Sequence, residues 1–245
     1  MRLWIDTDAG DHPDDTIALW CAARAPNVDL VGVSTVDGDV NSRANFVRTL
    51  VPGVDVYAGP PDPEHLASVD VLLGIGPWTN VARLAEAGAL PLRVVLMGGV
   101  LGTVRHRGEM VNVEHNVGSD AAAAAFLLAT TGNLIVVPLD ATARLAVDEH
   151  DERLLIDAIP RLARQLLAWR ERVGTEQPIV LHDPAALLVA IGERVARLES
   201  RRLEVQPEGV MSASVAGPLQ DVVAHIHADT TRERTVMLAS TQEGD

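Results

Sequence analysis

The sequence predicts a single α/β domain, residues 1–245, built on an open, mostly parallel, Rossmann-like sheet with helices on both faces. Short apolar segments of strand length alternate with segments of helical spacing, and no repeat, low-complexity stretch or linker interrupts them. Since the loops that follow parallel strands gather at one edge of the sheet, we expect the functional site at the carboxyl ends of the strands.

The alternation of strands and helices is clearest in the first 137 residues. Apolar runs predict strands at Leu3–Ile5, Leu30–Thr35, Val54–Tyr57, Val69–Leu73, Val94–Met97 and Leu134–Val137. Helical spacing predicts helices at Asp14–Arg24, Asn41–Leu50, Thr79–Ala87 and Asp120–Ala129. This order is typical of parallel sheets, whose strands are joined by helical crossovers.

Beyond residue 147 the pattern is less regular. Helical spacing across Asp148–Arg172 predicts a surface or lid helix with apolar positions at Leu154, Leu155, Ile159, Leu162, Leu166 and Leu167. A further helix is predicted from Asp183 to about Ala196. Apolar and polar residues alternate across Asp221–Ala228, which predicts a half-buried strand near a sheet edge.

The composition excludes several partners and chemistries. The formal net charge of −14 disfavours nucleic acid and anionic membranes as partners, because both are bound by basic surfaces. All 20 basic residues are arginines, which excludes Schiff-base catalysis and lysine-dependent phosphate loops. A small ligand that is neutral or cationic fits this charge best.

Three features predict a cytoplasmic protein without a membrane partner. The single cysteine, Cys21, lies among apolar residues of a predicted helix, so we expect it in the core and in a reducing compartment. The chain opens on a strand instead of the basic and apolar pattern of a signal peptide. Its longest apolar run, Ala121–Ala129, is shorter than the roughly 20 residues that span a bilayer.

The most informative segment is an acidic loop at the end of the first strand. It contains five carboxylates, which belong to Asp6, Asp8, Asp11, Asp14 and Asp15. Like charges this close repel by an energy on the order of several kcal/mol in a partly buried site, so the loop predicts a retained proton or a bound cation. Carboxylate oxygens favour calcium or magnesium. Capping of the next helix would explain one aspartate, but it cannot explain five.

Four more polar clusters occur at the ends of predicted strands or the starts of predicted helices. They are Thr35–Asp39, Gly74–Asn80, Met97–Gly99 together with Glu114–Asn116, and His182–Pro184. In this order, the clusters and the acidic loop resemble the motifs of the nucleoside hydrolases of the inosine-uridine preferring type. The resemblance runs from Leu3 to about Ala186.

The resemblance implies a calcium ion held by Asp8, Asp15, Asp183 and the backbone carbonyl of Ile75, with the ribose 2′- and 3′-hydroxyls completing the shell. Asp8 would then take a proton from a calcium-bound water that attacks C1′ through an oxocarbenium-like transition state. His182 would face the leaving base as the second catalytic residue. Substrate contacts are implied for Asp14, Asp39, Met97, Glu114 and Asn116.

Some of these residues also have structural interpretations. His182 could only orient Asp183, Glu114 could be a surface charge, and Asn116 could cap the helix that begins near Asp120. We favour contacts with the sugar for Glu114 and Asn116, because two side chains spaced two residues apart on an extended segment share one face.

The chain departs from the family pattern in ways that bear on the substrate. The segment Asp11-His12-Pro13 lengthens the acidic loop by two residues, and this makes Asp11 a candidate substitute for Asp8 or Asp14. Asp39 stands where the family usually has asparagine. The extra acidity of Asp11 and Asp39 suggests a cationic or amino-bearing substrate. The chain is also short in regions that normally build the base pocket and subunit contacts, so no base preference is predicted.

The sequence therefore predicts an enzyme that hydrolyses the N-glycosidic bond of ribonucleosides or a related N-riboside. By resemblance we expect a homo-oligomer, a dimer or a tetramer. A calcium-dependent ribonucleoside-binding protein without turnover is one alternative, since binding needs nearly the same ligands. A phosphohydrolase of the haloacid dehalogenase type is another, with Asp6 as nucleophile. It needs a later lysine or arginine, the chain has no lysine, and it leaves His182 and Asp183 unexplained.

Overall fold

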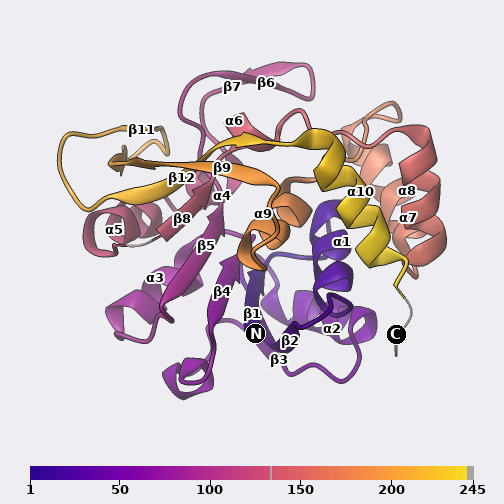
Figure 1. The fold of residues 1–245 in the computed structure, drawn as a ribbon, viewed down its shortest axis with the longest axis horizontal. Coiled ribbons are helices and arrows are strands. Elements are labelled where there is room, and N and C mark those ends of the chain that lie inside the picture. The colour runs from indigo at the N-terminus through magenta and orange to yellow at the C-terminus, as the bar shows by residue number, and fades with distance from the viewer. Residues whose placement is uncertain (133, 242–245) are drawn as a thin grey trace.

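The structure is a computed structural model that describes residues 1–132 and 134–241. An eight-stranded sheet crosses its centre in the order β3-β2-β1-β4-β5-β8-β12-β9 (Figure 1). The strands are β1 (Arg2–Thr7), β2 (Asp29–Thr35), β3 (Val56–Ala58), β4 (Val71–Gly74), β5 (Arg93–Met97), β8 (Leu134–Val137), β9 (Ala196–Arg201) and β12 (Gln220–Ile226). Neighbouring strands are parallel except for β12 and β9, which confirms the predicted mostly parallel sheet.

The strand order has a switch point between β1 and β4. From β1 the chain builds one half of the sheet through β2 and β3, and it then crosses to β4 and builds the other half through β5 and β8. At such a point the connections leave in opposite directions and open a crevice at the carboxyl ends of the strands. The acidic loop follows β1 directly, so the fold places it at this crevice.

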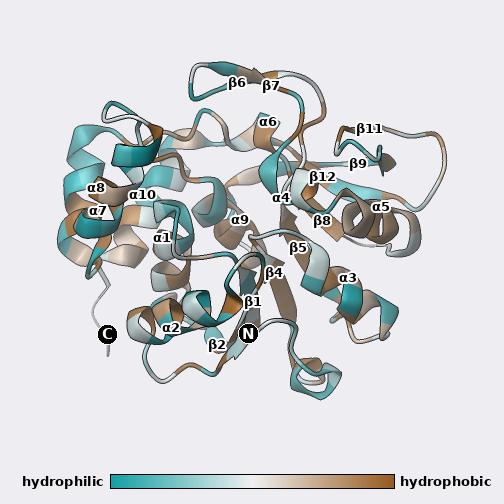
Figure 2. Ribbon diagram, turned by 180° about the vertical axis from the view of Figure 1, so that it is seen from behind, coloured by the Kyte–Doolittle hydropathy of each residue, from teal (hydrophilic) through white to brown (hydrophobic). Residues whose placement is uncertain are grey.

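Helices cover both faces of the sheet, as the sequence predicts. One face packs against α1 (Pro13–Ala22), α2 (Val40–Leu50), α7 (Glu149–Ala158), α8 (Leu162–Val173), α9 (His182–Ala190) and α10 (Ala228–Ala239), and the other against α3 (Thr79–Glu86) and α5 (Ala121–Thr130). Leu3 and Ile5 are buried on the first face and Trp4 on the second, the alternation expected of a strand covered on both sides. Figure 2 shows the central strands as mainly hydrophobic and the outer helices as mixed.

Two predicted helices end earlier than their patterns indicate. The segment Asp148–Arg172 forms α7 and α8 instead of one helix, because Pro160 cannot continue a helix and Arg161 adopts a left-handed φ of 68°. The helix predicted from Asp183 to Ala196 is α9, which ends at Ala190 just before Gly192, a glycine with a φ of 83°.

Five strands, β6, β7, β9, β10 and β11, were not predicted from the sequence. The predicted strand at Asp221–Ala228 is β12, but the edge of the sheet is formed by β9, which was not predicted. Neither were two small hairpins, β6 (Val104–His106) with β7 (Glu109–Val111), and β10 (Leu203–Val205) with β11 (Met211–Ala213). Their strands have three residues each, too few to show a period. The remaining elements are η1 (Pro63–Leu66), α4 (His115–Ser119) and α6 (Leu139–Thr142).

Two further expectations concern the core and the membrane. Cys21 is a buried core residue, as predicted, and its thiol lies 3.5 Å from the backbone oxygen of Thr235. Within residues 1–132 and 134–241, no helix combines the length and the apolar character that a membrane crossing requires.

We predict that Gly32→Ala destabilises the sheet. A Cβ at Gly32 would lie 2.3 Å from the ring of Trp4, which is buried and donates a 3.0 Å hydrogen bond to Ser34 Oγ. Overpacking of this kind lowers the free energy of unfolding by about 1–3 kcal/mol, which urea denaturation would measure. Gly102→Ala is the control, because its Cβ would meet Asp140 Oδ1 only at 3.8 Å; equal stability of the two variants would contradict the prediction.

Candidate active site

A cavity of about 810 Å³ opens at the carboxyl end of the sheet. Loops after β1, β2, β4 and β5 line it together with the β6–β7 hairpin, α4 and α9. The cavity brings together almost every site residue predicted from the sequence, namely Asp8, Asp14, Asp15, Ile75, Met97, Glu114, Asn116, His182 and Asp183.

The deepest feature of the site is a cluster of three buried aspartates, Asp14, Asp15 and Asp183, which we call the carboxylate triad. One carboxylate oxygen from each lies within 4.8 Å of the others. All three occupy first helical turns, Asp14 and Asp15 in α1 and Asp183 in α9, where the helix dipole favours negative charge. Such a set of hard oxygen atoms can hold a metal ion.

Burial and mutual repulsion set the charge of the carboxylate triad. Burial raises the pKa of Asp14 to about 6 and raises the pKa values of Asp15 and Asp183 well above their usual range. The neighbouring carboxylates raise the pKa of Asp183 further. These shifts are opposed at Asp15 by the hydroxyl of Thr7, which donates a 2.6 Å hydrogen bond to Oδ1, and by Arg43. At Asp14 they are opposed by a backbone hydrogen bond and by Arg107. At neutral pH the cluster therefore favours protons or a cation.

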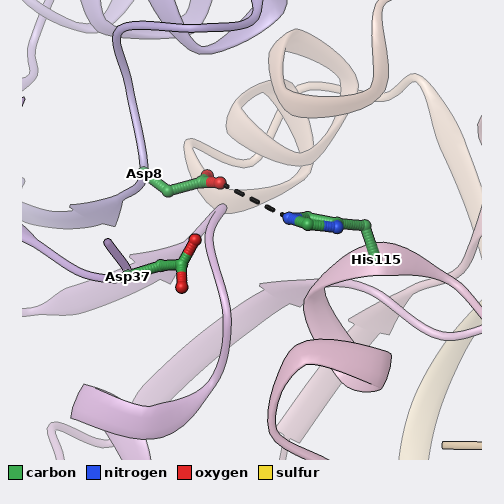
Figure 3. Close-up of side chains that lie close together, drawn as sticks. All are labelled: Asp8, Asp37 and His115. Carbon is green, nitrogen blue, oxygen red and sulfur yellow. Dashed lines mark ion pairs between the residues drawn. The ribbon is translucent and has the colours of Figure 1, made fainter. Parts of the chain in front are cut away.

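Asp8 lies beside the triad in a second group with Asp37 and His115 (Figure 3). Its Oδ2 is 3.9 Å from His115 Nε2, the pair joined by the dashed line in Figure 3. Burial raises the pKa of Asp8 to about 6, while Arg43 and His115 oppose that shift. Of the ligand set implied by resemblance, Asp15 and Asp183 thus come together with Asp14, and Asp8 faces the other group.

The Asp11-His12-Pro13 segment of the acidic loop and the residues before it are held by α2 and α8. Arg43 donates to the backbone oxygens of Asp8 and Ala9, and Gln165 Nε2 donates to the backbone oxygen of His12 at 2.9 Å. Asp11 forms ion pairs with Arg43 at 3.5 Å and Arg172 at 3.6 Å. Asp11 therefore does not replace Asp8 or Asp14 in either acidic group.

Asp6 lies below the cavity and does not line it. Its side chain is buried, and Oδ1 accepts hydrogen bonds from Ser34 Oγ at 2.5 Å and Asn80 Nδ2 at 2.9 Å. Burial raises the pKa of Asp6 to about 7. The phosphohydrolase alternative needs Asp6 as an accessible nucleophile, and this position removes its main support.

Glu114 and Asn116 do not lie on an extended segment, contrary to the prediction. Glu114 caps α4, and its carboxylate accepts hydrogen bonds from the backbone nitrogens of Gly99, Asn116 and Val117 at 2.8, 2.9 and 3.2 Å. Asn116 lies in the first turn of α4, and its Nδ2 donates to the Met97 carbonyl at 3.2 Å. It also lies 3.4 Å from the Ile75 carbonyl. Both residues still line the cavity, because the cap turns the start of α4 toward it.

His182 begins α9 and lines the cavity. Its Nδ1 lies 2.8 Å from Thr142 Oγ1, and its buried Nε2 has no hydrogen-bond partner among the residues that the structure describes. The ring of His106 lies 5.0 Å away, centroid to centroid. Burial lowers the pKa of His182 well below its usual range, so the imidazole is neutral at pH 7. The hydrogen bond to Thr142, and not one to Asp183, fixes the ring.

Asp39 is the one predicted contact that the structure places elsewhere. It caps α2 by accepting hydrogen bonds from the backbone nitrogens of Asn41 and Ser42, both at 3.1 Å, and it does not line the main cavity. The chain turns just before it, where Asp37 and Gly38 take φ values of 64° and 55°. This turn directs Asp37 into the cavity in place of Asp39.

Several cavity residues were not identified from the sequence as site residues. They are His12, Asp37, Arg43, His106, Arg107 and Arg172. His12 lies in the acidic loop, Asp37 follows β2, Arg43 lies in α2 and Arg172 in α8. His106 and Arg107 belong to the β6–β7 hairpin, which was not predicted. Only the concentration of polar residues in Thr35–Asp39 was a usable signal, because the other positions depend on long-range packing.

The fold and the cavity define a doubly wound α/β protein whose site can hold a cation beside a small polar ligand. The family model of the "Inosine-uridine preferring nucleoside hydrolase" matches residues 67–242. The chain belongs to this family, and it is therefore an N-glycosyl hydrolase.

Individual relatives match over most of both chains, and solved structures share the fold. The non-specific ribonucleoside hydrolase RihC of Salmonella newport is 24% identical over 268 residues, covering 87% of this chain and 86% of that protein. An uncharacterized protein of Schizosaccharomyces pombe is 26% identical, covering 96% of this chain and 94% of its own. Among solved structures, the plant nucleoside hydrolase PpNRh1 superposes with a TM-score of 0.81 at 16% identity, covering 98% of this chain and 99% of its own. A purine-preferring ribonucleoside hydrolase from Gardnerella vaginalis gives 0.78 at 20% identity, covering 99% and 100%.

We predict that Asp183→Asn stabilises the cation-free protein and abolishes stabilisation by calcium. The substitution removes a buried negative charge from the carboxylate triad and also removes a ligand. Calcium should stabilise the wild type by about 2.7 kcal/mol at 100 times its dissociation constant. Calorimetry in chelator and in calcium would measure both effects. Asp62→Asn, in the exposed group of Asp62, Glu64 and His65, is the matched control, and a calcium shift that survives Asp183→Asn would rule out the triad as the binding site.

We also predict that the stabilisation by Asp183→Asn in chelator grows with pH. Because burial raises the pKa values of the triad carboxylates above 3.8, the folded protein binds more protons than the unfolded chain, and stability falls as the pH rises through about 4 to 6 and above. The substitution should be nearly neutral at about pH 4 and clearly stabilising at pH 7. Urea denaturation of both proteins at the two pH values measures the difference, and a gain that is larger at low pH would contradict it.

Proposed function

We propose that this protein hydrolyses the N-glycosidic bond of ribonucleosides or a related N-riboside, releasing ribose and the free base, with calcium as its cofactor. The observation that carries the proposal is the carboxylate triad, which lies beside Asp8 in a cavity large enough for a nucleoside. Membership of the nucleoside hydrolase family supports the reaction type.

The donor atoms fit calcium. We propose Asp8, Asp15, Asp183 and the Ile75 carbonyl as its ligands, with Asp14 as a further candidate because its carboxylate is grouped with those of Asp15 and Asp183. Calcium accepts six to eight oxygen ligands in flexible geometry, whereas magnesium demands a nearly ideal octahedron. When bound, the ion would acidify a coordinated water and hold sugar hydroxyl groups.

Asp8 is our candidate for the general base. Its carboxylate lies at the cavity wall between the triad and His115, where it can accept a proton from a water that attacks C1′. Arg43 holds the backbone of Asp8 in place through the Asp8 carbonyl. The surrounding carboxylates would stabilise positive charge that develops on the ribose ring.

The sugar and the base would contact different walls of the cavity. We propose that Asp14, Met97 and Asn116 contact the ribose, and that Glu114, whose carboxylate already accepts three backbone hydrogen bonds, mainly holds Asn116 in position. Asp37 takes the place expected for Asp39.

His182 would face the leaving base. If the Thr142 hydroxyl donates to Nδ1, the imidazole carries its proton on Nε2, the unpartnered atom at the cavity. A neutral imidazole in this tautomer can donate a hydrogen bond to a ring nitrogen or carbonyl of the base as the glycosidic bond breaks.

A calcium-dependent binding protein without turnover is the second candidate. The observation that favours it is the separation of Asp8 from the carboxylate triad into a different acidic group. A general base displaced by about an ångström can lose on the order of 10²-fold in rate while the ligand still binds.

The setting of the enzyme is also part of the proposal. The buried free thiol of Cys21 fits a reducing compartment, so we propose a cytoplasmic enzyme of nucleoside salvage. The net charge of −14 supports small-molecule ribonucleosides, and not nucleic acid, as partners. By family resemblance we propose a homo-oligomer, a dimer or a tetramer.

We predict that a panel of ribonucleosides is hydrolysed with release of free ribose, and that Asp8→Asn lowers kcat by about 10²- to 10⁴-fold, the usual contribution of a general base. Reducing-sugar assays with and without chelator would measure this. Asp39→Ser is the matched control, because serine retains the helix cap outside the cavity. Calcium-dependent binding without ribose release would support the second candidate. Full activity of Asp8→Asn in chelator would exclude the calcium mechanism.

A further inference from the structure

The β6–β7 hairpin directs an arginine into the cavity. Its turn consists of Arg107 and Gly108, with φ values of 49° and 87°, which is the pattern of a tight hairpin turn with two left-handed residues. Asparagine, aspartate and glycine are preferred at such positions, and a large side chain is strained there. Arg107 nevertheless occupies the turn and lines the cavity. Strained residues of this kind concentrate at functional sites.

Within residues 1–132 and 134–241, no carboxylate forms a close ion pair with the guanidinium of Arg107, and Asp14 is the carboxylate that acts on it electrostatically. The central carbon of the guanidinium lies 5.1 Å from the ring centroid of Trp169, a fully buried residue of α8, and its Nε is buried without a hydrogen-bond partner. The other two arginines of the cavity differ in this respect. Arg43 pairs with Asp11 and Asp37, and Arg172 pairs with Asp11. Arg107 is thus the cavity arginine whose donors are left for a ligand.

The cavity is divided by charge between its two walls. The sheet side presents the carboxylate triad and Asp8, while the hairpin side presents Arg107 together with His106 and His182. The acidity that suggested a cationic substrate does not reach this wall. Asp11 is bound to two arginines, and Asp39 lies outside the main cavity. The extra aspartates therefore do not favour a cationic substrate.

We propose that Arg107 binds an anionic substituent of the riboside substrate. A carboxylate on the base and a phosphate on the sugar share the chemistry that a planar guanidinium recognises through paired hydrogen bonds. The carboxylate is the source nearer to His182, which we place at the base. The inference rests on the proposed function in one respect, that the ligand is a riboside. The group that it assigns lies on a different wall of the same cavity.

Two pairs of ligands separate the sources. The ribosides of pyridine-3-carboxylate and pyridine-3-carboxamide share a cationic pyridinium ring and differ in its substituent, an anionic carboxylate in the first and an uncharged amide in the second. Uridine 5′-monophosphate differs from uridine only in the phosphate. Binding by isothermal titration calorimetry and hydrolysis by ribose or ribose-phosphate release are both measured in calcium. Binding tests the inference even if nothing is hydrolysed, a result that would overturn the proposed function alone.

The variants separate binding from folding. Arg107→Asn keeps a residue that tolerates the left-handed turn and removes the cation, while Arg107→Lys keeps a charge without the planar fork. Arg105→Gln is the matched control, since Arg105 is exposed on the same hairpin and does not line the cavity. Thermal unfolding would verify that all three remain folded.

In one of the two pairs, we expect the wild type to bind the ligand with the anionic substituent more tightly than its counterpart without it by roughly tenfold to hundredfold, the range that a charged hydrogen bond supplies. Arg107→Asn should abolish this preference, Arg107→Lys should restore part of it, and Arg105→Gln should leave it intact. A preference within the pyridine pair assigns the anion to the base, and one within the uridine pair assigns it to the sugar. Equal affinities within both pairs, or a preference that survives Arg107→Asn, would overturn the inference.

Discussion

The site depends on one constraint, the burial of three like-charged side chains at the end of a sheet. Two unit charges about 4 Å apart repel by about 4 kcal/mol at an effective dielectric constant of about 20, so Asp14, Asp15 and Asp183 cannot all ionise without compensation. The dipoles of α1 and α9 and the Thr7 hydroxyl supply part of it. The remainder must come from a proton or a cation. The same repulsion that would weaken an empty site thus provides its affinity for a metal ion.

The scaffold can sustain this repulsion because the two helices that carry the triad cannot move. Every residue of α1 and of α9 is buried, and the two helices pack against each other and within the larger core cluster. Below them, Oδ1 of Asp6 accepts hydrogen bonds from Ser34 of β2 and from Asn80 of α3. On the opposite wall, the Glu114 carboxylate at the start of α4 accepts a hydrogen bond from the backbone nitrogen of Gly99. Buried polar networks of this kind fix strand ends to within hydrogen-bond tolerance. The carboxylates therefore project from two packed helices whose surroundings are joined by buried hydrogen bonds.

The sequence predicted the sheet and the helices of the first half because these depend on local periodicity, and it predicted the edge that holds the site because parallel strands end together. It predicted nine of the cavity residues through the resemblance of its ordered motifs to those of nucleoside hydrolases. It failed where distant contacts decide the structure. Pro160 divides a helix whose apolar spacing continues past it, and β9 is a strand because it pairs with β12. Asp37 replaces Asp39 because two left-handed residues turn the chain between them. Glu114 and Asn116 line the same wall of the cavity because Glu114 caps α4 and Asn116 lies in its first turn. The spacing rule for an extended segment does not predict this arrangement.

The acidic loop shows why a sequence motif does not by itself determine a metal site. Its backbone oxygens are bound by Arg43 of α2 and by Gln165 and Arg172 of α8. These contacts hold the loop where Asp8 lies near His115 and still acts electrostatically on all three carboxylates of the triad. The same helix α8 supplies Trp169, the ring beneath Arg107. Helix α8 contributes no part of the acidic motif, yet it binds the loop backbone at Asp11 and His12 and also packs Trp169 against the guanidinium on the opposite wall. The backbone of Asp8 itself is bound by Arg43 of α2, so the packing of both helices governs how the two ends of a ligand are held relative to each other.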